Sequence, residues 1–401
     1  MKIVLFDTRE TYENLLPLSF TRPVAAFRIG IVTIAEKWQH FLPGDYSYLP
    51  MDYLREKFPL HCGQDEEALF IAGNKLPDQT IAFEAMQLRP GDALRDKGGV
   101  WAYRGTLNEF RALPGTVGRE SANDSRRINY VFDIFLVNAQ EIQNDYMWLT
   151  RNRRSAEPDK SVTVIGDPCL KKGGLPALFI EEGAQVEGCT INVKDGPVYI
   201  GRNSQVMEGC CVRGPLALCD NAKIRMGSKI YGGCTFGPYC KVGGEIDNTV
   251  IFGYSNKAHD GYLGNAVLGE WCNIGAGTNS SNLKNDYSKV RIWNYASRRF
   301  MRTDLQFCGL IMGDHSKAGV NCMFNTATVV GVGVNLHGAG FPRQFIASFQ
   351  AGSPEAGFSD VSIDTFMQVA SRVMGRRGLE LSRVDRHIFE HIYDMASQLK
   401  H

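Results

Sequence analysis

The chain has 401 residues, enough for two or three domains, and its 22% charged and 44% hydrophobic residues are ordinary for a globular protein. A formal net charge of +1 supplies no overall field that favours nucleic acid or a membrane surface, so an anionic ligand must be held by local basic groups. The start MKIVLFDTRE lacks the apolar run of a signal peptide, and no stretch approaches ~18 apolar residues, so we expect a cytoplasmic protein without membrane insertion.

Residues 1–160 mix short apolar strands with helical spacing, which predicts an α/β domain. KIVLF (2–6) is a first strand, and RIGIVTIAEKW (28–38) is a second apolar segment that runs towards a helix. EALFIAGNKLPD (67–78) has a strand that ends in a polar loop, and residues 129–149 have helical apolar spacing. The polar, proline-containing run 150–161 is the expected linker to the next domain.

From residue 161 the pattern changes to a six-residue period, clearest between Val198 and Val242. The residues that keep this step are Ile200, Val206, Val212, Leu218, Ile224, Ile230, Phe236 and Val242. A hexapeptide period is the signature of a parallel β-helix, in which three hexads form one triangular coil and each leading aliphatic residue points inward. We therefore predict a left-handed parallel β-helix over residues 161–345.

A small residue follows most of these leaders by four positions, as a tight inward corner requires. The residues are Ser204, Cys210, Ala222, Ser228, Cys234 and Cys240, with Cys272 and Cys322 at the same offset further on. The chain has 11 cysteines but no C-x-x-C motif, so we interpret those at the corners as small buried hydrophobic residues rather than redox or metal-binding groups.

The six-residue phase is interrupted in places, and parallel β-helices accommodate such interruptions as loops at a corner. It slips after Val242, returns at Tyr262, Leu268 and Ile274, and is lost again between residue 279 and about residue 311. It continues at Met312 and every sixth residue to Leu336. Beyond it, residues 346–401 form a predicted helical tail, expected to cap the open end of the solenoid.

One stretch, residues 256–290, concentrates polar side chains within about one and a half coils: His259, Tyr262, Asn273, Asn279 and Asn282. Because a residue 14 positions later returns close to the starting corner, His259 and Asn273 are predicted to face one cleft. An ammonium group must lose a proton before its nitrogen can attack a thioester. A histidine with a pKa near neutrality can accept that proton. The glycines of NIGAG would let a ligand approach the backbone closely.

The same stretch resembles the acetyltransferase half of GlmU, the bifunctional family that makes UDP-N-acetylglucosamine. The shared residues are HDGYLG (259–264), NIGAGT (273–278) and Asn282. The resemblance implies acetyl-CoA as co-substrate, His259 as general base and contact of the coenzyme with the backbone at Ala276. It implies that Tyr262, Asn273 and Asn282 bind the amino-sugar phosphate, and that Glu245 orients the base.

The chain departs from the GlmU pattern at several positions. Asp247 stands where the family has a phosphate-binding lysine, so Lys229, Lys241 or Lys257 would have to replace it; Lys229 is our candidate substrate-binding residue. Val320 stands where the family has a serine near the coenzyme. The loop 279–310 is longer and carries four arginines, either an anion-binding group or a solvated basic loop: Arg291, Arg298, Arg299 and Arg302.

The N-terminal part resembles sugar nucleotidyltransferases of a divergent GlmU-like group, through LLPLSFTRPV (15–24). The glycine-rich phosphate loop of that family is absent, since FDTRETYEN (6–14) contains no glycine. Arg22 and Arg28 are predicted to bind nucleotide phosphates in its place, because a guanidinium group binds phosphate through two parallel hydrogen bonds. The alternative is that both arginines make surface ion pairs.

With the resemblance to GlmU, these observations predict acetyl transfer from acetyl-CoA to glucosamine-1-phosphate. The resemblance of the N-terminal part implies a second step, uridylyl transfer from UTP with Mg²⁺. The resemblance also implies a homotrimer in which three prisms pack side by side. The main alternative is a nucleotidyltransferase for another sugar-1-phosphate, with the β-helix as an oligomerisation stem. A trimeric metal hydratase is less consistent with the sequence, because His259, His315 and His337 are widely spaced.

Overall fold

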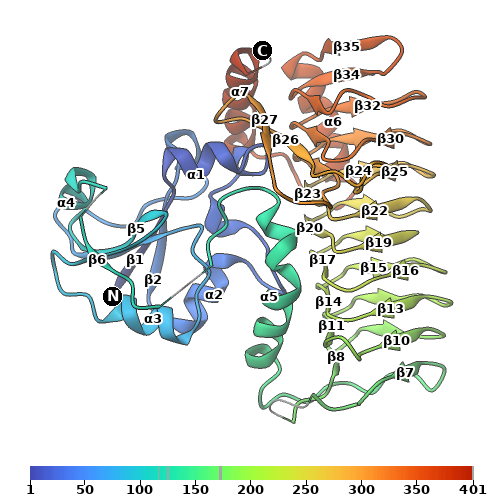
Figure 1. The fold of residues 1–401 in the computed structure, drawn as a ribbon, viewed down its shortest axis with the longest axis horizontal. Helices are drawn as coiled ribbons and strands as arrows, with labels where there is room; N and C mark the ends of the chain where they lie inside the picture. The colour runs from blue at the N-terminus through green and yellow to red at the C-terminus, as the bar shows by residue number, and fades with distance from the viewer. Residues whose placement is uncertain (116, 124–125, 171–173, 400–401) are drawn as a thin grey trace.

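The computed structural model describes residues 1–115, 117–123, 126–170 and 174–399. It contains the three predicted parts: an N-terminal α/β domain, a parallel β-helix and two C-terminal helices (Figure 1). Residues 400–401, at the end of the predicted tail, lie outside the described residues. No helix in the described part of the chain is long and apolar enough to cross a membrane.

The α/β domain is built on a mixed sheet with strand order β2-β1-β3-β5-β4-β6. Strand β1 pairs in parallel with β2 and β3, and its residues from Ile3 to Phe6 are all buried, which is why the apolar run KIVLF forms a central strand. The strands are β1 (Lys2–Phe6), β2 (Asp45–Leu49), β3 (Ala68–Ala72), β4 (Ala93–Asp96), β5 (Gly99–Gly105) and β6 (Arg119–Glu120). The helices are α1 (Arg9–Asn14), α2 (Ile34–Phe41), α3 (Gln79–Met86), α4 (Leu107–Ala112) and α5 (Asp133–Leu149), with short 3₁₀ turns at Leu18–Phe20, Val24–Ala26 and Asp52–Leu54.

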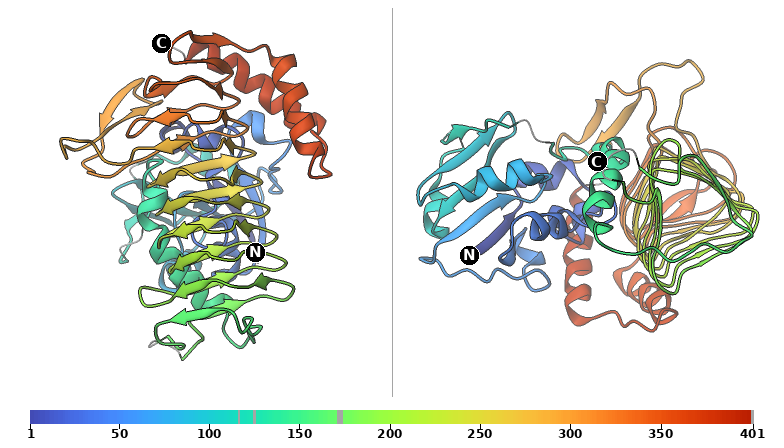
Figure 2. Two further views of the ribbon diagram at one scale, coloured as in Figure 1. Left: turned by 90° about the vertical axis from the view of Figure 1, so that its right-hand side faces the viewer. Right: turned by 90° about the horizontal axis from the view of Figure 1, so that it is seen from below.

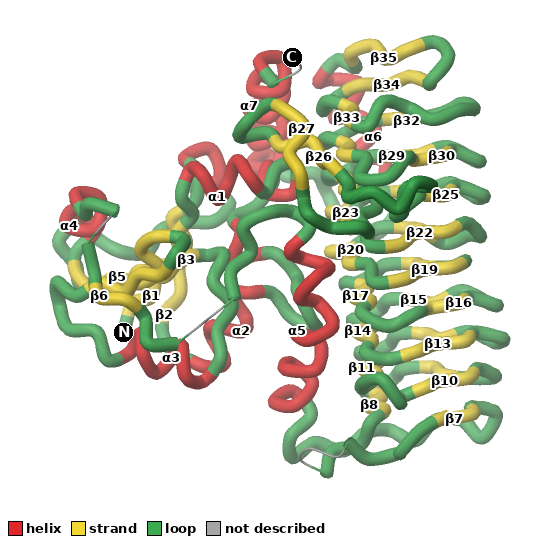
Figure 3. Tube along the Cα trace, viewed as in Figure 1, coloured by secondary structure: helices red, strands yellow, loops and turns green. Residues whose placement is uncertain are grey.

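The predicted linker 150–161 contains no helix or strand and leads from α5 to the first coil (Figure 3).

Each coil then contributes strands to three sheets in turn. We name them the domain-facing sheet, which lies against the α/β domain, the recess sheet, which carries the recess described below, and the outer sheet. The domain-facing sheet contains β8 (Leu178–Ile180), β11 (Val198–Ile200), β14 (Leu216–Leu218), β17 (Cys234–Phe236), β20 (Val250–Gly253), β23 (Val267–Glu270), β28 (Ile311–Met312), β31 (Val329–Val330) and β33 (Phe345–Ile346). The recess sheet contains β9 (Gln185–Val186), β12 (Gln205–Val206), β15 (Lys223–Ile224), β18 (Lys241–Val242), β21 (Asn256–Lys257), β24 (Asn273–Ile274), β29 (Lys317–Ala318), β32 (Asn335–Leu336), β34 (Gln350–Ser353) and β35 (Gly357–Asp360). The outer sheet contains β7 (Thr163–Ile165), β10 (Thr190–Asn192), β13 (Cys211–Arg213), β16 (Lys229–Ile230), β19 (Glu245–Asp247), β22 (Tyr262–Gly264), β25 (Asn279–Ser280) and β30 (Met323–Phe324).

The interior of the prism follows the six-residue prediction. All eight leaders between Ile200 and Val242 are at most 3% exposed and belong to one core. The predicted small corner residues are buried to the same degree, and all 11 cysteines are free. The interpretation of the corner cysteines as small buried hydrophobic residues is therefore confirmed.

The prediction was wrong at one step of this register. Tyr262 was assigned to the returning six-residue phase, but Leu263 is the residue that points inward, paired with Ile246 on the neighbouring strand. Tyr262 consequently lies on the outside of the outer sheet. The shift arises because the two preceding coils are shorter than 18 residues, as the pairing of Val242 with Lys257 shows.

The α/β domain packs along the length of the domain-facing sheet, with α5 between the two (Figures 1 and 2). Outward side chains of this sheet, Phe179, Tyr199 and Ala217, form a buried cluster with Ile142 and Tyr146 of α5. A further side chain of the helix, Asn138, accepts a hydrogen bond from Gly30 N at 2.7 Å and donates one to Gly233 O at 2.8 Å. Helix α5 therefore joins the two domains.

The interruption between residues 279 and 310 is a β-hairpin rather than an unstructured loop. Strands β26 (Arg291–Asn294) and β27 (Arg299–Arg302) pair antiparallel, and Tyr295 packs edge-on against Phe20 of the α/β domain. The four arginines of this segment are exposed. The hairpin thus contributes to the contact between the domains.

The C-terminal part begins later than predicted and runs elsewhere. Strand β34 still pairs with β32, so the recess sheet extends beyond the predicted boundary at residue 345. Helices α6 (Ile363–Gly375) and α7 (Arg383–Gln398) lie against the side of the prism rather than over its end (Figure 2). Lys57 of the α/β domain forms an ion pair with Asp385 at 2.7 Å, so α7 also contacts that domain.

Candidate functional site

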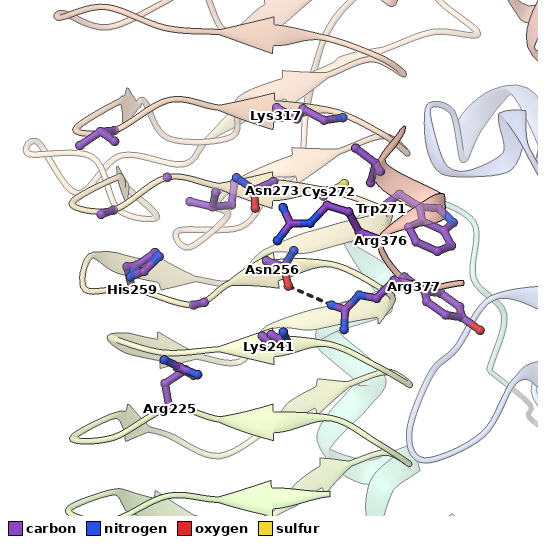
Figure 4. A pocket seen from close by; sticks show the side chains of 17 residues that line it. Arg225, Lys241, Asn256, His259, Trp271, Cys272, Asn273, Lys317, Arg376 and Arg377 are labelled. Atoms are coloured by element: carbon purple, nitrogen blue, oxygen red, sulfur yellow. Dashed lines mark hydrogen bonds between the residues drawn. The ribbon is translucent and has the colours of Figure 1, made fainter. Parts of the chain in front are cut away.

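A recess of about 680 Å³ lies on the recess sheet, between its outward side chains and the end of helix α6 (Figure 4). His259 lines one edge and Trp271 the opposite edge, and Asn273 lies between them. His259 and Asn273 therefore face one cavity, as their separation of 14 residues predicts. Ala276, at the corner after β24, also lines this recess.

His259 is exposed and lies in the turn between β21 and β22, at the corner shared by the recess and outer sheets. The turn is held from inside the prism by Lys257, which is 1% exposed and occupies a position otherwise taken by aliphatic residues. Its ammonium group donates hydrogen bonds to His259 O at 2.6 Å and Gly243 O at 3.1 Å. Burial lowers the pKa of Lys257 to about 8. Lys257 is therefore directed away from any substrate phosphate, although the sequence made it a candidate for that contact.

The glycines of NIGAG lie against the next coil of the prism. A Cβ atom on Gly275 would lie 2.3 Å from Gly319 O of the next coil, and one on Gly277 would lie 2.0 Å from the side chain of Asn321. Gly277 also has a φ of 70°, which side chains disfavour. These glycines are thus required by the stacking of coils, whether or not a ligand approaches.

The other predicted site residues lie around the corner, on the outer sheet. Lys229, Glu245 and Tyr262 occupy neighbouring positions on β16, β19 and β22. Asn282 donates a hydrogen bond to the Tyr262 hydroxyl at 2.9 Å. Burial, with Asp247 nearby, raises the pKa of Tyr262 to about 12, so this hydroxyl stays protonated and can donate a hydrogen bond. The predicted residues therefore form two groups, which meet at the corner that carries His259.

The residues that differ from the GlmU pattern are also located. Asp247 lies beside Glu245 on the outer sheet, and burial together with that carboxylate raises the pKa of Asp247. Lys229 and Lys241 are the two remaining candidates to replace the phosphate-binding lysine of the GlmU pattern. They lie on different faces, since Lys229 is on the outer sheet and Lys241 lines the recess. Val320 is 65% exposed and lines the recess near Ala276.

Arg22 and Arg28 lie between the domains. The Arg22 guanidinium is buried and pairs with Glu270 at 2.9 Å and with Asp314. Arg28 donates a hydrogen bond to Ile31 O at 2.5 Å. Nucleotide binding by these two arginines stays a prediction, and Arg22 would have to leave both carboxylates to reach a phosphate.

The α/β domain has its own cleft of about 650 Å³ at the carboxyl end of β1, lined by Thr8, Lys97, Gly98, Gly99 and Arg127 among others. Ligands of open α/β sheets commonly bind at this end of the strands. The glycines come from the connection between β4 and β5, not from the segment 6–14 after β1, which contains none. The signal that was overlooked is the pair of glycines in RDKGGVW (95–101).

The sequence reasoning also missed several residues of the recess, among them Lys317, Arg376 and Arg377. Trp271 was missed too; it stacks on Tyr254 with ring centroids 4.4 Å apart and lines the recess. A signal was present for the arginines, since MGRRGLE (374–380) places two cations between glycines at the end of a predicted helix. Nothing local, however, indicates that this helix returns to the prism.

The chain is similar to known transferases. Residues 3–154 match a family model described as sugar nucleotidyl transferase. Proteins named "Bifunctional protein GlmU" are similar over longer stretches. That of Synechococcus elongatus is 26% identical over 168 residues, covering 40% of this chain and 33% of the relative. That of Acaryochloris marina is 38% identical over 171 residues, covering 40% and 35%.

The GlmU of Heliobacterium modesticaldum is 27% identical over 248 residues, covering 55% of this chain and 49% of the relative. With the first of these relatives, the match spans about a third of the relative's length. Among solved structures, a hexapeptide transferase family protein from Anaplasma phagocytophilum is 14% identical with a TM-score of 0.24, covering 59% of this chain and 96% of that chain. An Arabidopsis UDP-N-acetylglucosamine acyltransferase is 10% identical with a TM-score of 0.19, covering 61% and 94%.

Proposed function

We propose that this protein transfers an acetyl group from acetyl-CoA to the amine of glucosamine-1-phosphate at the corner that carries His259. The observation that carries the proposal is the position of this histidine. His259 is exposed, its backbone is held by Lys257, and it lines a recess large enough for part of a coenzyme. The similarity to GlmU proteins, which covers 40% of this chain for one relative and 55% for another, supports the same chemistry.

In the proposed reaction the substrate ammonium group first releases one proton to solvent. His259 takes a second proton from the amine as its nitrogen lone pair attacks the thioester carbonyl carbon. The carbon–sulfur bond then breaks, and the leaving thiolate takes the proton back from the imidazolium. The negative oxygen of the intermediate needs a donor. The N–H groups of Gly275 and Gly277 already donate to Ala318 O and Asp260 O. No partner for the Ala276 N–H is found among the described residues, so we assign the donor to Ala276.

The two groups of side chains fit two substrates that approach from opposite sides of the corner. The acetyl donor enters from the recess sheet, past Asn273 and Ala276. The amino sugar enters from the outer sheet, where Tyr262 and Asn282 bind it and Lys229 contacts its phosphate. Glu245, next to Tyr262 in the ladder, contributes to the orientation of the base.

We further propose that the protein is a homotrimer, as the resemblance to GlmU implies. The domain-facing sheet is covered by the α/β domain of the same chain, so contacts between copies must use the remaining faces. The outer sheet carries its predicted substrate residues on an uncovered surface, which a second copy would enclose. Light scattering at micromolar concentration tests this, and a monomeric mass would contradict it.

A second candidate function is nucleotidyl transfer in the α/β domain, supported by the cleft at the end of β1 and by the match of residues 3–154. Within the described residues no group of three or more His, Cys, Asp or Glu could hold a metal ion. Mg²⁺ for this reaction would therefore be bound largely by the nucleotide phosphates, as is usual for this ion. If only this activity is present, the β-helix serves as an oligomerisation stem.

Product analysis by mass spectrometry separates these functions. We expect acetyl-CoA and glucosamine-1-phosphate to yield N-acetylglucosamine-1-phosphate without added metal. Addition of UTP and Mg²⁺ yields UDP-N-acetylglucosamine if the α/β domain is active. No acetylated product in either mixture would contradict the main proposal, while a nucleotide sugar formed from N-acetylglucosamine-1-phosphate alone would favour the alternative.

A further inference from the structure

The recess collects positive charge from segments that are far apart in the sequence. Its lining includes five cations: Arg225, Lys241, Lys317, Arg376 and Arg377. No carboxylate lines it among the residues that the structure describes. Two of the cations come from the C-terminal tail, which the sequence predicted only as a cap. Figure 4 shows Arg376 between Asn273 and Trp271, and Arg377 beside Asn256.

These cations have no anionic partner of their own. Across the described ranges, the side chains of Arg225, Lys241 and Arg376 have no hydrogen bond or ion pair. Lys317 donates to His315 O at 2.7 Å, and Arg377 donates to Asn256 Oδ1 and Tyr239 O, both at 3.2 Å. All three acceptors are neutral, so the charge of the recess is left uncompensated.

The uncompensated charge is evident at Lys241. Burial, together with four neighbouring cations that include Arg377 and Arg225, lowers the pKa of this lysine. Like charges that crowd one cavity destabilise the folded chain, and a bound anion relieves this repulsion. The charge of a single phosphate is met by two or three cations, whereas five match a ligand with more than one phosphate group.

We propose that the recess binds the pyrophosphate of a nucleotide-bearing substrate, and that Arg376 and Arg377 determine specificity for that group. A guanidinium group binds phosphate oxygens through two parallel hydrogen bonds, which a lysine cannot do. The identification of the ligand as coenzyme A rests on the proposed function. A nucleotide sugar carries the same pyrophosphate and is the second source to be distinguished.

The proposal has a consequence for the choice of acetyl donor. His259 lies at one edge of the recess and the two tail arginines lie towards the other, so the reacting thioester and the phosphates are bound by different elements. A donor that has the thioester but no nucleotide, such as acetyl-pantetheine, reaches His259 without contacting Arg376 or Arg377. The tail therefore selects acetyl-CoA over donors that lack the nucleotide.

The test compares donors in wild type, in the double variant Arg376→Ala/Arg377→Ala and in the control Arg372→Ala. Arg372 is an exposed arginine of the same helix that does not line the recess. We expect the double variant to raise KM for acetyl-CoA about a hundredfold, since each charge-assisted hydrogen bond contributes about tenfold. KM for acetyl-pantetheine and kcat with either donor should stay within about twofold, and Arg372→Ala should resemble wild type.

Arg377 also holds the tail to the prism, so a structural effect must be separated from a binding effect. Loss of the tail would impair both donors equally, and that result would overturn the proposal. The single variant Arg376→Ala, which removes a side chain without a partner, gives a second test with an expected tenfold effect on acetyl-CoA alone. Unchanged KM values in both variants would also overturn the proposal.

Calorimetric binding keeps this test independent of the proposed reaction. Coenzyme A, UDP-N-acetylglucosamine and inorganic pyrophosphate are titrated into wild type and the double variant. If wild type binds coenzyme A or pyrophosphate and the double variant does not, the pyrophosphate site stands even when no acetyl transfer is found. Loss of UDP-N-acetylglucosamine binding alone would assign the site to the nucleotide sugar, and absence of binding by all three probes would contradict it.

Discussion

The domain-facing sheet and the recess sheet are built from the same coils and share one interior, yet their outward residues differ completely. On the domain-facing sheet the outward positions carry Phe179, Tyr199 and Phe252, which are buried under the α/β domain. On the recess sheet the corresponding ladder carries Lys223, Lys241, Asn256, Asn273 and Lys317. The six-residue period thus determines the scaffold, and the residues between the leaders determine whether a face packs or binds.

The largest effect on stability is expected for a substitution on the domain-facing sheet, whose outward side chains are apolar. Phe252 is 3% exposed and packs against Phe27 of the α/β domain with ring centroids 5.2 Å apart. Phe252→Ala should lower the free energy of unfolding by about 3–5 kcal/mol, because it leaves a cavity between the domains. Urea unfolding measures the loss. Asn273→Ala, on the exposed recess sheet, is the control and should stay within about 0.5 kcal/mol of wild type; equal effects of the two variants would contradict the comparison.

A slightly smaller effect is expected at the ion pairs that join Arg22 of the α/β domain to the corner between the two sheets. Arg22→Met leaves Asp314 buried without its cation, which should cost about 3 kcal/mol at pH 7. Burial already raises the pKa of Asp314, and loss of Arg22 raises it further. The loss should therefore shrink as the pH falls and Asp314 takes up a proton. A loss that is constant from pH 7 to pH 4 would show that Asp314 does not depend on Arg22.

A gain in stability is expected at Lys257, a lysine that occupies an interior position of the recess sheet. The pKa of Lys257 is about 8 in the folded chain and 10.5 in the unfolded chain, so the unfolded chain binds more protons between these values. Stability of wild type should consequently rise with pH from about 8 to 10.5, by at most about 3 kcal/mol. Lys257→Met should be more stable by about 2 kcal/mol at pH 7 and lack this slope.

The same variant should lose acetyl-transfer activity, because the turn of His259 is no longer held by the lysine. Lys257→Arg, which keeps a buried donor, should recover part of the activity. A variant Lys257→Met that is both more stable and fully active would show that the lysine does not position the histidine. Thermal unfolding between pH 7 and 10 and thiol release at pH 7.5 provide the two measurements.

The smallest effect is expected for the reactivity of the cysteine thiols in the interior that both sheets share. Only Cys169 and Cys211 are exposed, and burial raises the pKa of interior thiols such as Cys234 and Cys240 to about 12. A chromogenic disulfide reagent should therefore modify no more than these two of the 11 cysteines in the native chain. The remaining thiols should react only in denaturant. Rapid reaction of interior cysteines in the native chain would contradict the tight packing of the prism interior.

The sequence predicted the repeating part of the molecule well because its pattern is local. A leader such as Ile224 and a small corner residue such as Ser228 are four positions apart and follow from the geometry of one coil. His259 and Asn273 likewise line one recess, as their separation of 14 residues within a single coil predicts. The register failed at Tyr262 because shorter coils change the step, and the period alone does not reveal the length of a coil.

The contacts between distant segments could not be predicted from spacing. Arg22 and Asp314 are 292 positions apart, and neither residue lies in a pattern that indicates the other. Arg377 likewise meets Asn256 across 121 positions, because helix α6 turns back along the prism. Both contacts depend on how domains and helices pack. The carboxylates that pair with Arg22 and the five cations that line the recess could therefore be identified only from the structure.

The central claim is that the recess sheet carries an acetyl-transfer site whose base is His259. It is tested most directly by the rate of thiol release from acetyl-CoA with glucosamine-1-phosphate, in wild type, His259→Ala and His337→Ala. His337 is an exposed histidine at a later corner of the same sheet that does not line the recess, so it serves as control. We expect kcat to fall about 10²–10⁴-fold in His259→Ala, with an unchanged unfolding midpoint, and to stay near wild type in His337→Ala. A folded His259→Ala protein that turns over at the wild-type rate would contradict the account.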